Sequence, residues 1–217
     1  MNNELITKSK ATKAAARVLA TLNTAAKDKA LQVIAETIME REPIILEAND
    51  RDIESGRANG LSEAILDRLL LTAPRLKSMA TDVKSIVNLP DPVGEEFESR
   101  RLPNGLRVSK RRIPIGVIGV IYESRPNVTI DIASLCLKAG DAVILRGGKE
   151  TLRSNMALVR MVEAALDKAG APAGAVQLIE NTDRALVSQL LKMREVIDMV
   201  IPRGDGSPGT ARSPSGP

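Results

Sequence analysis

The chain has 217 residues, 43% of them hydrophobic and 27% charged, which is enough for one large domain with a buried core. It contains no His or Trp and a single Cys, Tyr and Phe, so a histidine base, a disulfide within the chain and a cysteine-based metal cluster are excluded. A net charge of +4 with so few aromatic residues does not indicate a nucleic-acid partner. No segment has the composition of a membrane span or a signal peptide, so we expect a cytoplasmic protein.

The N-terminal part of the chain is predicted to be helical. Apolar residues recur at helical spacing in five segments: residues 5–22, 24–39, 43–56, 62–70 and 72–89. Thr24 is a plausible N-cap of the second segment. Pro43 suits the first turn of the third, which Gly56 would end.

Residues 92–112 change this pattern and predict a β-hairpin. Asn104-Gly105 lies between two extended runs, which is a strong hairpin signal. A two-stranded ribbon has little core of its own and needs a partner, either the rest of the domain or another subunit. We interpret its basic cluster, Lys110 to Arg112, as a solvated strand edge.

The second half predicts an α/β fold. The apolar run at residues 113–121 suits a strand buried on both faces. Further strands are predicted at residues 142–145, 175–179 and 196–201, and helices at 127–138, 150–169 and 184–193. This alternation indicates a doubly wound parallel sheet, which binds ligands at the carboxyl ends of its strands.

Three loops follow those strand ends and are expected to converge: residues 122–127, 146–150 and 202–206. In the second loop, Gly147 and Gly148 would let a ligand approach the backbone, and the next helix would offer free N–H groups to a phosphate. Arg146 and Lys149 add positive charge. A tight turn with solvated basic side chains explains the loop equally well, because no dinucleotide or Walker fingerprint is present.

Asn127, Arg125 and Cys136 are candidates for chemical roles. Asn127 either caps the helix that it begins or donates its amide to a substrate oxygen, and Arg125 beside it suits a substrate anion. Cys136 lies within a predicted helix, with nothing nearby to lower its pKa. We therefore interpret it as a buried structural thiol.

Long motifs at these loops resemble those of a known family. Residues 112–129, 134–151 and 197–204, with the shorter segments 57–62 and 66–69, resemble the gamma-glutamyl phosphate reductases, also called glutamate-5-semialdehyde dehydrogenases. The resemblance implies an aldehyde-dehydrogenase-like α/β fold: N-terminal helices plus a doubly wound parallel sheet with a β-hairpin arm. It implies NADPH-dependent reduction of L-glutamate 5-phosphate to L-glutamate 5-semialdehyde and phosphate, in proline biosynthesis, through a cysteine thioester.

The resemblance also implies residue roles. Asn127 matches the oxyanion-stabilising asparagine, and residues 92–112 match the arm that pairs subunits into a homo-oligomer. The residues implied to bind cofactor are Arg146, Gly147, Gly148, Lys149, Glu150, Arg203 and Gly204. A lysine near the adenosine ribose favours a 2′-phosphate, in agreement with NADPH. No metal and no membrane partner is implied.

The chain departs from the family after Gly204. Residues 205–217, rich in Gly, Pro and Ser, replace the family's phosphate loop and helix, and we expect them to form a disordered, non-family tail. Residues 1–204 would then be the nucleotide-binding domain. The family's catalytic cysteine lies in a second domain missing from this sequence, and Cys136 does not match it. We therefore expect a truncated, inactive form, as a shifted reading frame would produce. The alternative is a non-catalytic nucleotide-binding or subunit-pairing module.

Overall fold

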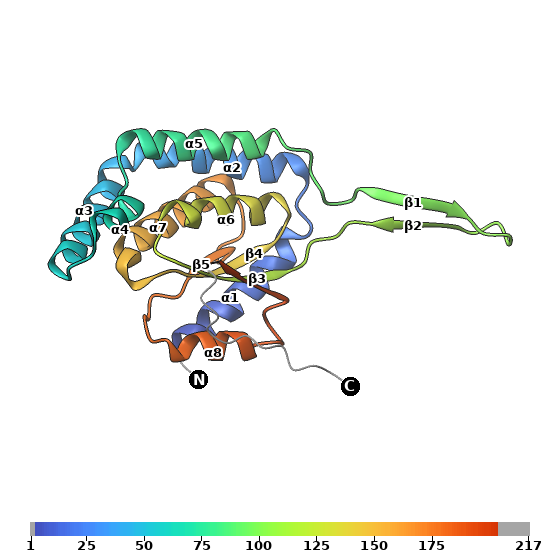
Figure 1. Ribbon diagram of the computed structural model, residues 1–217. Helices are drawn as coiled ribbons and strands as arrows, with labels where there is room; N and C mark the ends of the chain where they lie inside the picture. The colour runs from blue at the N-terminus through green and yellow to red at the C-terminus, as the bar shows by residue number, and fades with distance from the viewer. Residues whose placement is uncertain (1–2, 204–217) are drawn as a thin grey trace.

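A four-stranded parallel sheet organises the computed structural model, which describes residues 3–203 (Figure 1). The strand order is β5-β4-β3-β6. The strands are β3 Val117–Tyr122, β4 Ala142–Arg146, β5 Val176–Leu178 and β6 Met199–Arg203. Each neighbouring pair is parallel, which confirms the sheet predicted from the alternation of strands and helices.

Helices cover both faces of this sheet (Figure 1). One face carries α2 Thr24–Glu40, α5 Ala73–Val87, α6 Asn127–Lys138 and α7 Leu152–Ala169, and the other carries α1 Asn3–Leu19 and α8 Ala185–Lys192. The helices α3 Glu42–Ala58 and α4 Glu63–Leu69 extend the first layer, and a short 3₁₀ turn, η1 Lys149–Thr151, precedes α7. The fold is therefore doubly wound, with an aliphatic core between the layers.

The central strand begins later than its apolar sequence predicts. β3 begins at Val117, and Ile113, at the start of the apolar run, is 76% exposed. The entry to the strand is fixed by two carboxylates, since Asp141 accepts the N–H of Gly116 and Asp198 accepts that of Val117, both at 2.8 Å. Residues 113–116 therefore connect the hairpin to the sheet and do not belong to the buried strand.

Two predicted helix boundaries were also wrong. The N-cap of α2 is Asn23, whose side chain accepts the N–H of Ala26 at 2.9 Å, while Thr24 is the first helical residue. Gly56 lies inside α3 and does not end it. A Cβ at Gly56 would press on the side chain of Leu66, so the glycine allows α3 and α4 to pack closely.

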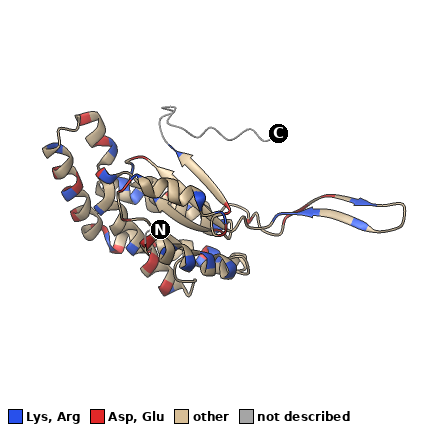
Figure 2. Cartoon of the chain, turned by 90° about the horizontal axis from the view of Figure 1, so that it is seen from below, with Lys and Arg blue, Asp and Glu red and all other residues tan. Residues whose placement is uncertain are grey.

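The predicted hairpin forms a long arm that projects from the body (Figures 1 and 2). Its strands, β1 Glu96–Arg101 and β2 Arg107–Arg111, are antiparallel, with an irregular register between Phe97 and Arg100. Leu106 and Val108 are 57% and 38% exposed. Lys and Arg residues occur on both of its strands (Figure 2). The arm therefore has no core of its own in this structure.

A buried ion pair anchors the base of the arm. The ammonium of Lys27, only 2% exposed, donates to the carboxylate of Asp91 at 2.7 Å. The hydroxyl of Thr24 and the N–H of Val93 also donate to this carboxylate, at 2.7 and 3.0 Å. Burial alone would raise the pKa of Asp91, but these hydrogen bonds and the charge of Lys27 hold it below its ordinary value.

The substitution Asp91→Ala is expected to lower the free energy of unfolding by about 3 kcal/mol, because it leaves the Lys27 ammonium buried and unpaired. Denaturant unfolding measures this loss. Because the folded-state pKa of Asp91 is lowered, its contribution is present above the ordinary carboxyl pKa and is lost as the pH falls through the folded value. Lys168→Ala removes the exposed ion pair with Glu40 and should cost less than about 1 kcal/mol. Equal losses in the two variants would contradict the anchoring role.

Candidate functional site at the carboxyl edge of the sheet

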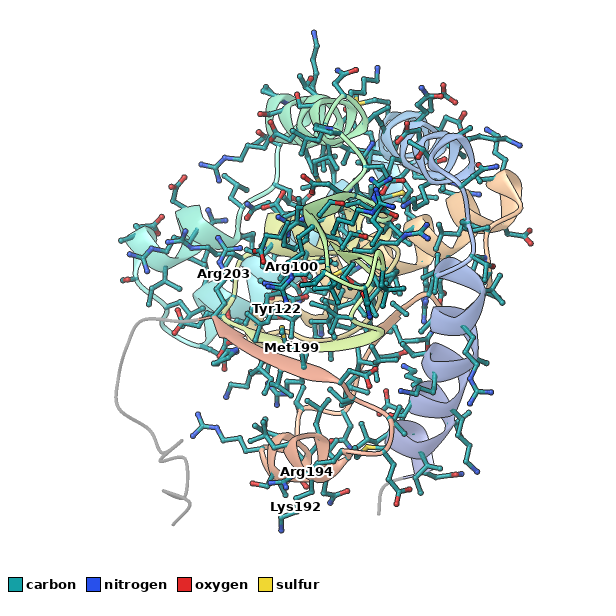
Figure 3. All side chains as sticks on the ribbon, turned by 90° about the vertical axis from the view of Figure 1, so that its right-hand side faces the viewer. Arg100, Tyr122, Lys192, Arg194, Met199 and Arg203 are labelled. Carbon is teal, nitrogen blue, oxygen red and sulfur yellow. The ribbon has the colours of Figure 1, made fainter. Side chains whose placement is uncertain are left out.

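The loops after β3 and β4 and the end of β6 meet at one edge of the sheet, as predicted. Ile121 is aligned with Arg146, and Tyr122 with Arg203. Figure 3 shows Tyr122 and Arg203 at the same end of the sheet, while Lys192, the last residue of α8, and Arg194 lie away from it. Gly204 and residues 205–217 lie outside the described residues.

The glycine loop after β4 is packed by the protein's own side chains. A Cβ at Gly147 would collide with the amide of Asn155, and a Cβ at Gly148 would collide with the hydroxyl of Ser124. Ser124 in turn donates to the carboxylate of Glu150 at 2.6 Å. The close approach to the backbone that these glycines allow is therefore used within the chain, which favours the tight-turn interpretation of this loop.

The N-terminus of α7 is already occupied by a carboxylate. Asp52 of α3, fully buried, accepts the N–H and the hydroxyl of Ser154 at 2.8 and 2.7 Å, and the N–H of Arg153 at 3.4 Å. Two of the N–H groups that this helix was predicted to offer to a phosphate, those of Arg153 and Ser154, are therefore already taken by Asp52. The sequence contains one indication of this contact. Two polar residues, Asn49 and Asp52, lie on the otherwise apolar buried face of α3 and would need polar partners.

The two basic residues of the same loop have different environments. Arg146 donates to the carbonyl oxygens of Gly147 and Thr182 at 2.9 and 2.8 Å, so it joins the loops after β4 and β5. Its Nε is buried and has no hydrogen-bond partner among the described residues. Lys149 is exposed and forms no hydrogen bond or ion pair within residues 3–203. Lys149 is therefore available to an anionic ligand, whereas Arg146 holds the loop.

Asn127 is exposed at the first turn of α6 and does not cap it. Pro126 occupies the cap position, and the Asn127 amide donates to Asp131 at 3.3 Å. Asn127 and Arg125 line a cavity of about 410 Å³ between α6 and the α4–α5 region. Burial raises the pKa of Asp131; the charge of Arg203 opposes this shift, and that of Asp82 adds to it. The asparagine predicted from its motif therefore faces a polar cavity.

A buried chain of hydroxyl and amide groups supports these loops from below. The hydroxyls of Tyr122 and Thr129 are 2.7 Å apart, Thr129 donates to Asn155 at 3.0 Å, and Asn155 donates to Thr151 at 3.1 Å. Burial raises the pKa of Tyr122 above its ordinary value, so its hydroxyl stays neutral. This chain connects β3, α6, α7 and η1, and it was not predicted, because it arises only when these elements pack together.

Cys136 is a buried thiol, as predicted. It is 7% exposed on α6, and burial, together with the charge of Asp141, raises its pKa to about 12. Thiolate is the reactive form, and it is nearly absent at neutral pH for such a group.

Elsewhere, residues 3–203 bring together no group of three His, Cys, Asp or Glu side chains that could hold a metal ion. No helix in the same range is long and apolar enough to cross a membrane.

Cys136 is expected to resist iodoacetamide at pH 8 in the folded chain and to react fully once the chain is unfolded in guanidinium chloride. Mass spectrometry of the alkylated protein measures both states. The unfolded sample is the matched control, because its thiol has an ordinary pKa and full access. Rapid alkylation of the folded protein would contradict the structural role.

A doubly wound sheet with converging loops at its carboxyl edge is the architecture of a nucleotide-binding α/β domain. The model of the aldehyde dehydrogenase family matches residues 3–211, and the chain belongs to that family. Its sequence is 59% identical over 201 residues to a gamma-glutamyl phosphate reductase of Vibrio vulnificus, covering 93% of this chain and 48% of that protein. A gamma-glutamyl phosphate reductase of Tolumonas auensis is 58% identical over 92% of this chain and 48% of its own length.

Solved structures give the same result. The gamma-glutamyl phosphate reductase of Thermotoga maritima matches with a TM-score of 0.92 and 44% identity, over 94% of this chain and 49% of that one. The Saccharomyces cerevisiae enzyme of the same name matches with a TM-score of 0.86 and 32% identity, over 95% of this chain and 52% of that one. The resemblance drawn from the motifs is confirmed, and the chain spans about half the length of the relatives it matches.

Proposed function

We propose that residues 1–204 form the nucleotide-binding domain of a cytoplasmic gamma-glutamyl phosphate reductase. The reaction is the reduction of L-glutamate 5-phosphate by NADPH to L-glutamate 5-semialdehyde and phosphate, in proline biosynthesis. The observation that carries this proposal is the 59% identity with an enzyme of that name over 93% of the chain.

Asn127 is proposed to stabilise the oxyanion that develops on the acyl carbon of the substrate. Its amide is exposed at the cavity, and its 3.3 Å contact with Asp131 is long enough to be exchanged for a substrate oxygen at little cost. The nucleophilic thiol cannot be Cys136, which is buried. It belongs in this proposal to the part of the enzyme that the present sequence does not match, so we expect this chain alone to be inactive.

The cofactor is proposed to lie along the loops after β4 and β6. Lys149 is exposed and unpaired in the described part of the chain, and its ammonium suits the 2′-phosphate that distinguishes NADPH from NADH. Arg203, exposed at the end of β6, would meet the pyrophosphate together with Gly204. Gly147, Gly148 and Glu150 are proposed to line this cofactor site, as the resemblance implies.

The substitution Lys149→Glu is expected to weaken NADPH binding about tenfold or more and to leave NADH binding nearly unchanged, because only NADPH presents a second phosphate to that position. Fluorescence titration of both nucleotides against this chain measures the effect. Lys192→Glu is the matched control, since Lys192 is an exposed lysine at the end of α8, away from the loops (Figure 3). An equal loss for the two nucleotides would show that Lys149 does not recognise the 2′-phosphate.

The arm supports a second role, subunit pairing into a homo-oligomer. Leu106 and Val108 are exposed on a ribbon that projects from the body (Figure 1), and a two-stranded ribbon is marginally stable without a partner. We propose that residues 92–112 pair with a second copy of the chain, and this pairing does not depend on catalytic activity.

The substitution Val108→Asp is expected to shift the chain towards the monomer, because it places a charge on the apolar stripe of the arm. Sedimentation equilibrium over a range of protein concentrations measures the association constant. Val18→Asp, at an exposed apolar position of α1, is the matched control and should leave association unchanged. A wild-type chain that is monomeric throughout would overturn the pairing role.

A further inference from the structure

The cavity beside Asn127 is lined by α4, α5, the start of α6 and the segments between them, with polar and charged side chains on α5 and α6. Ser78 and Asp82 lie one turn apart on α5, and Asn127 and Asp131 lie one turn apart on α6. All four side chains line the same space of about 410 Å³, which is open on one side. A cavity with this lining suits a small charged ligand better than an apolar one.

Some of the charges that line this cavity are already neutralised. Arg75 forms an ion pair with Asp67 at 2.8 Å. The same guanidinium donates to the carbonyl oxygens of Asp67 and Leu70 at 2.6 and 2.7 Å. Arg75 is therefore committed to shaping the turn between α4 and α5, and it offers little to a ligand.

Other charges are not neutralised. Asp82 forms no hydrogen bond or ion pair with any described residue, and Asp131 accepts the long contact from the Asn127 amide. Both carboxylates line the same cavity, and the charge of Asp82 raises the pKa of Asp131. The charge of Arg203 lowers the pKa of Asp131 by more than that of Asp82 raises it, but Arg203 forms no ion pair with Asp131 among the described residues. The pair lacks a cation in direct contact.

We propose that Asp82 and Asp131 together bind the α-ammonium group of an amino-acid substrate, so that the cavity selects amino acids over simple dicarboxylates. This inference rests on the proposed function, because it places the acyl carbon of the substrate at Asn127. The Asn127 amide contacts Asp131. In a substrate whose acyl group lies at Asn127, the ammonium group is separated from the acyl carbon by a short aliphatic chain, and it would therefore lie in the same cavity. Arg68 and Arg125 also line the cavity, are unpaired within residues 3–203, and suit the α-carboxylate.

Ligand-observed saturation-transfer NMR on this chain tests the assignment, with L-glutamate and glutarate as the probes. Glutarate lacks the ammonium group and is otherwise the same carbon skeleton. L-Glutamate is expected to bind about tenfold more tightly than glutarate, the usual size of a charge-assisted hydrogen bond. Asp82→Asn and Asp131→Asn should each weaken L-glutamate binding to the level of glutarate, without weakening glutarate binding.

Asp50→Asn is the matched control, because Asp50 is an exposed carboxylate of α3 outside the cavity, and it should keep the preference. If Asp82 or Asp131 had only a structural role, its substitution would weaken the binding of L-glutamate and of glutarate equally. Asp82 is exposed, so Asp82→Asn keeps the test informative even where Asp131→Asn does not fold.

An NADPH titration of the same samples separates this inference from the proposed function. Suppose that the chain binds NADPH but shows no preference for L-glutamate over glutarate, or does not bind L-glutamate at all. This result would overturn the ammonium site and leave the cofactor proposal standing. A preference for L-glutamate that Asp82→Asn removes, in a chain that does not bind NADPH, would support the ammonium site and count against the cofactor proposal.

Discussion

The carboxylate of Asp52 at the N-terminus of α7 is the contact on which the arrangement of the site depends. It accepts two backbone N–H groups and a hydroxyl from the start of α7, and it forms an ion pair with the guanidinium of Arg153 at 3.3 Å. The positive end of that helix and this guanidinium together compensate the buried charge. Asn49, one turn earlier on α3, donates to Ser154 at 3.0 Å and to the carbonyl of Leu69 at 2.8 Å, and it accepts the N–H of Leu71 at 2.7 Å. One polar cluster thus fixes α3, the end of α4 and α7 relative to one another.

The polar cluster around Asp52 limits where a ligand phosphate can bind. Doubly wound folds commonly place a ligand phosphate at the N-terminus of the helix after a glycine loop. Here Asp52 takes that position at α7, and side chains fill the space beside Gly147 and Gly148. For this reason we propose that the loop after β4 recognises an anion through the exposed side chain of Lys149. The start of α6 remains open, with Asn127 exposed beside the polar cavity. In the proposed function, the cofactor therefore lies on the β4 side of the sheet edge and the substrate on the α6 side.

The sequence predicted the order of elements and the parallel sheet, because helical periodicity, apolar runs and glycine turns are local signals. It did not predict the start of β3 at Val117, which depends on carboxylates of residues distant in the chain, Asp141 and Asp198. The motif identified Asn127 and Lys149 at the sheet edge. Asp82 and Asp131 were missed because each looks like an ordinary polar residue of an amphipathic helix, and only the packing of α5 on α6 brings them to one cavity.

The arm and the cavity depend on the same helix. α5 contributes Ser78 and Asp82 to the cavity and then leads, after Val87, to Asp91 at the base of the arm. The buried pair of Asp91 and Lys27 ties that base to α2, which itself packs along α5. Lys138 of α6 reinforces the same region, since it donates to Asp28 of α2 at 2.6 Å and to the carbonyl of Val87 at 2.9 Å. The direction of the arm is therefore set by the helices that shape the cavity, while its own apolar stripe remains exposed. The base of the arm is joined to α2, α5 and α6 by these contacts. The proposed subunit pairing through the arm would therefore help to hold α5 and α6 in place, without adding a residue to the site.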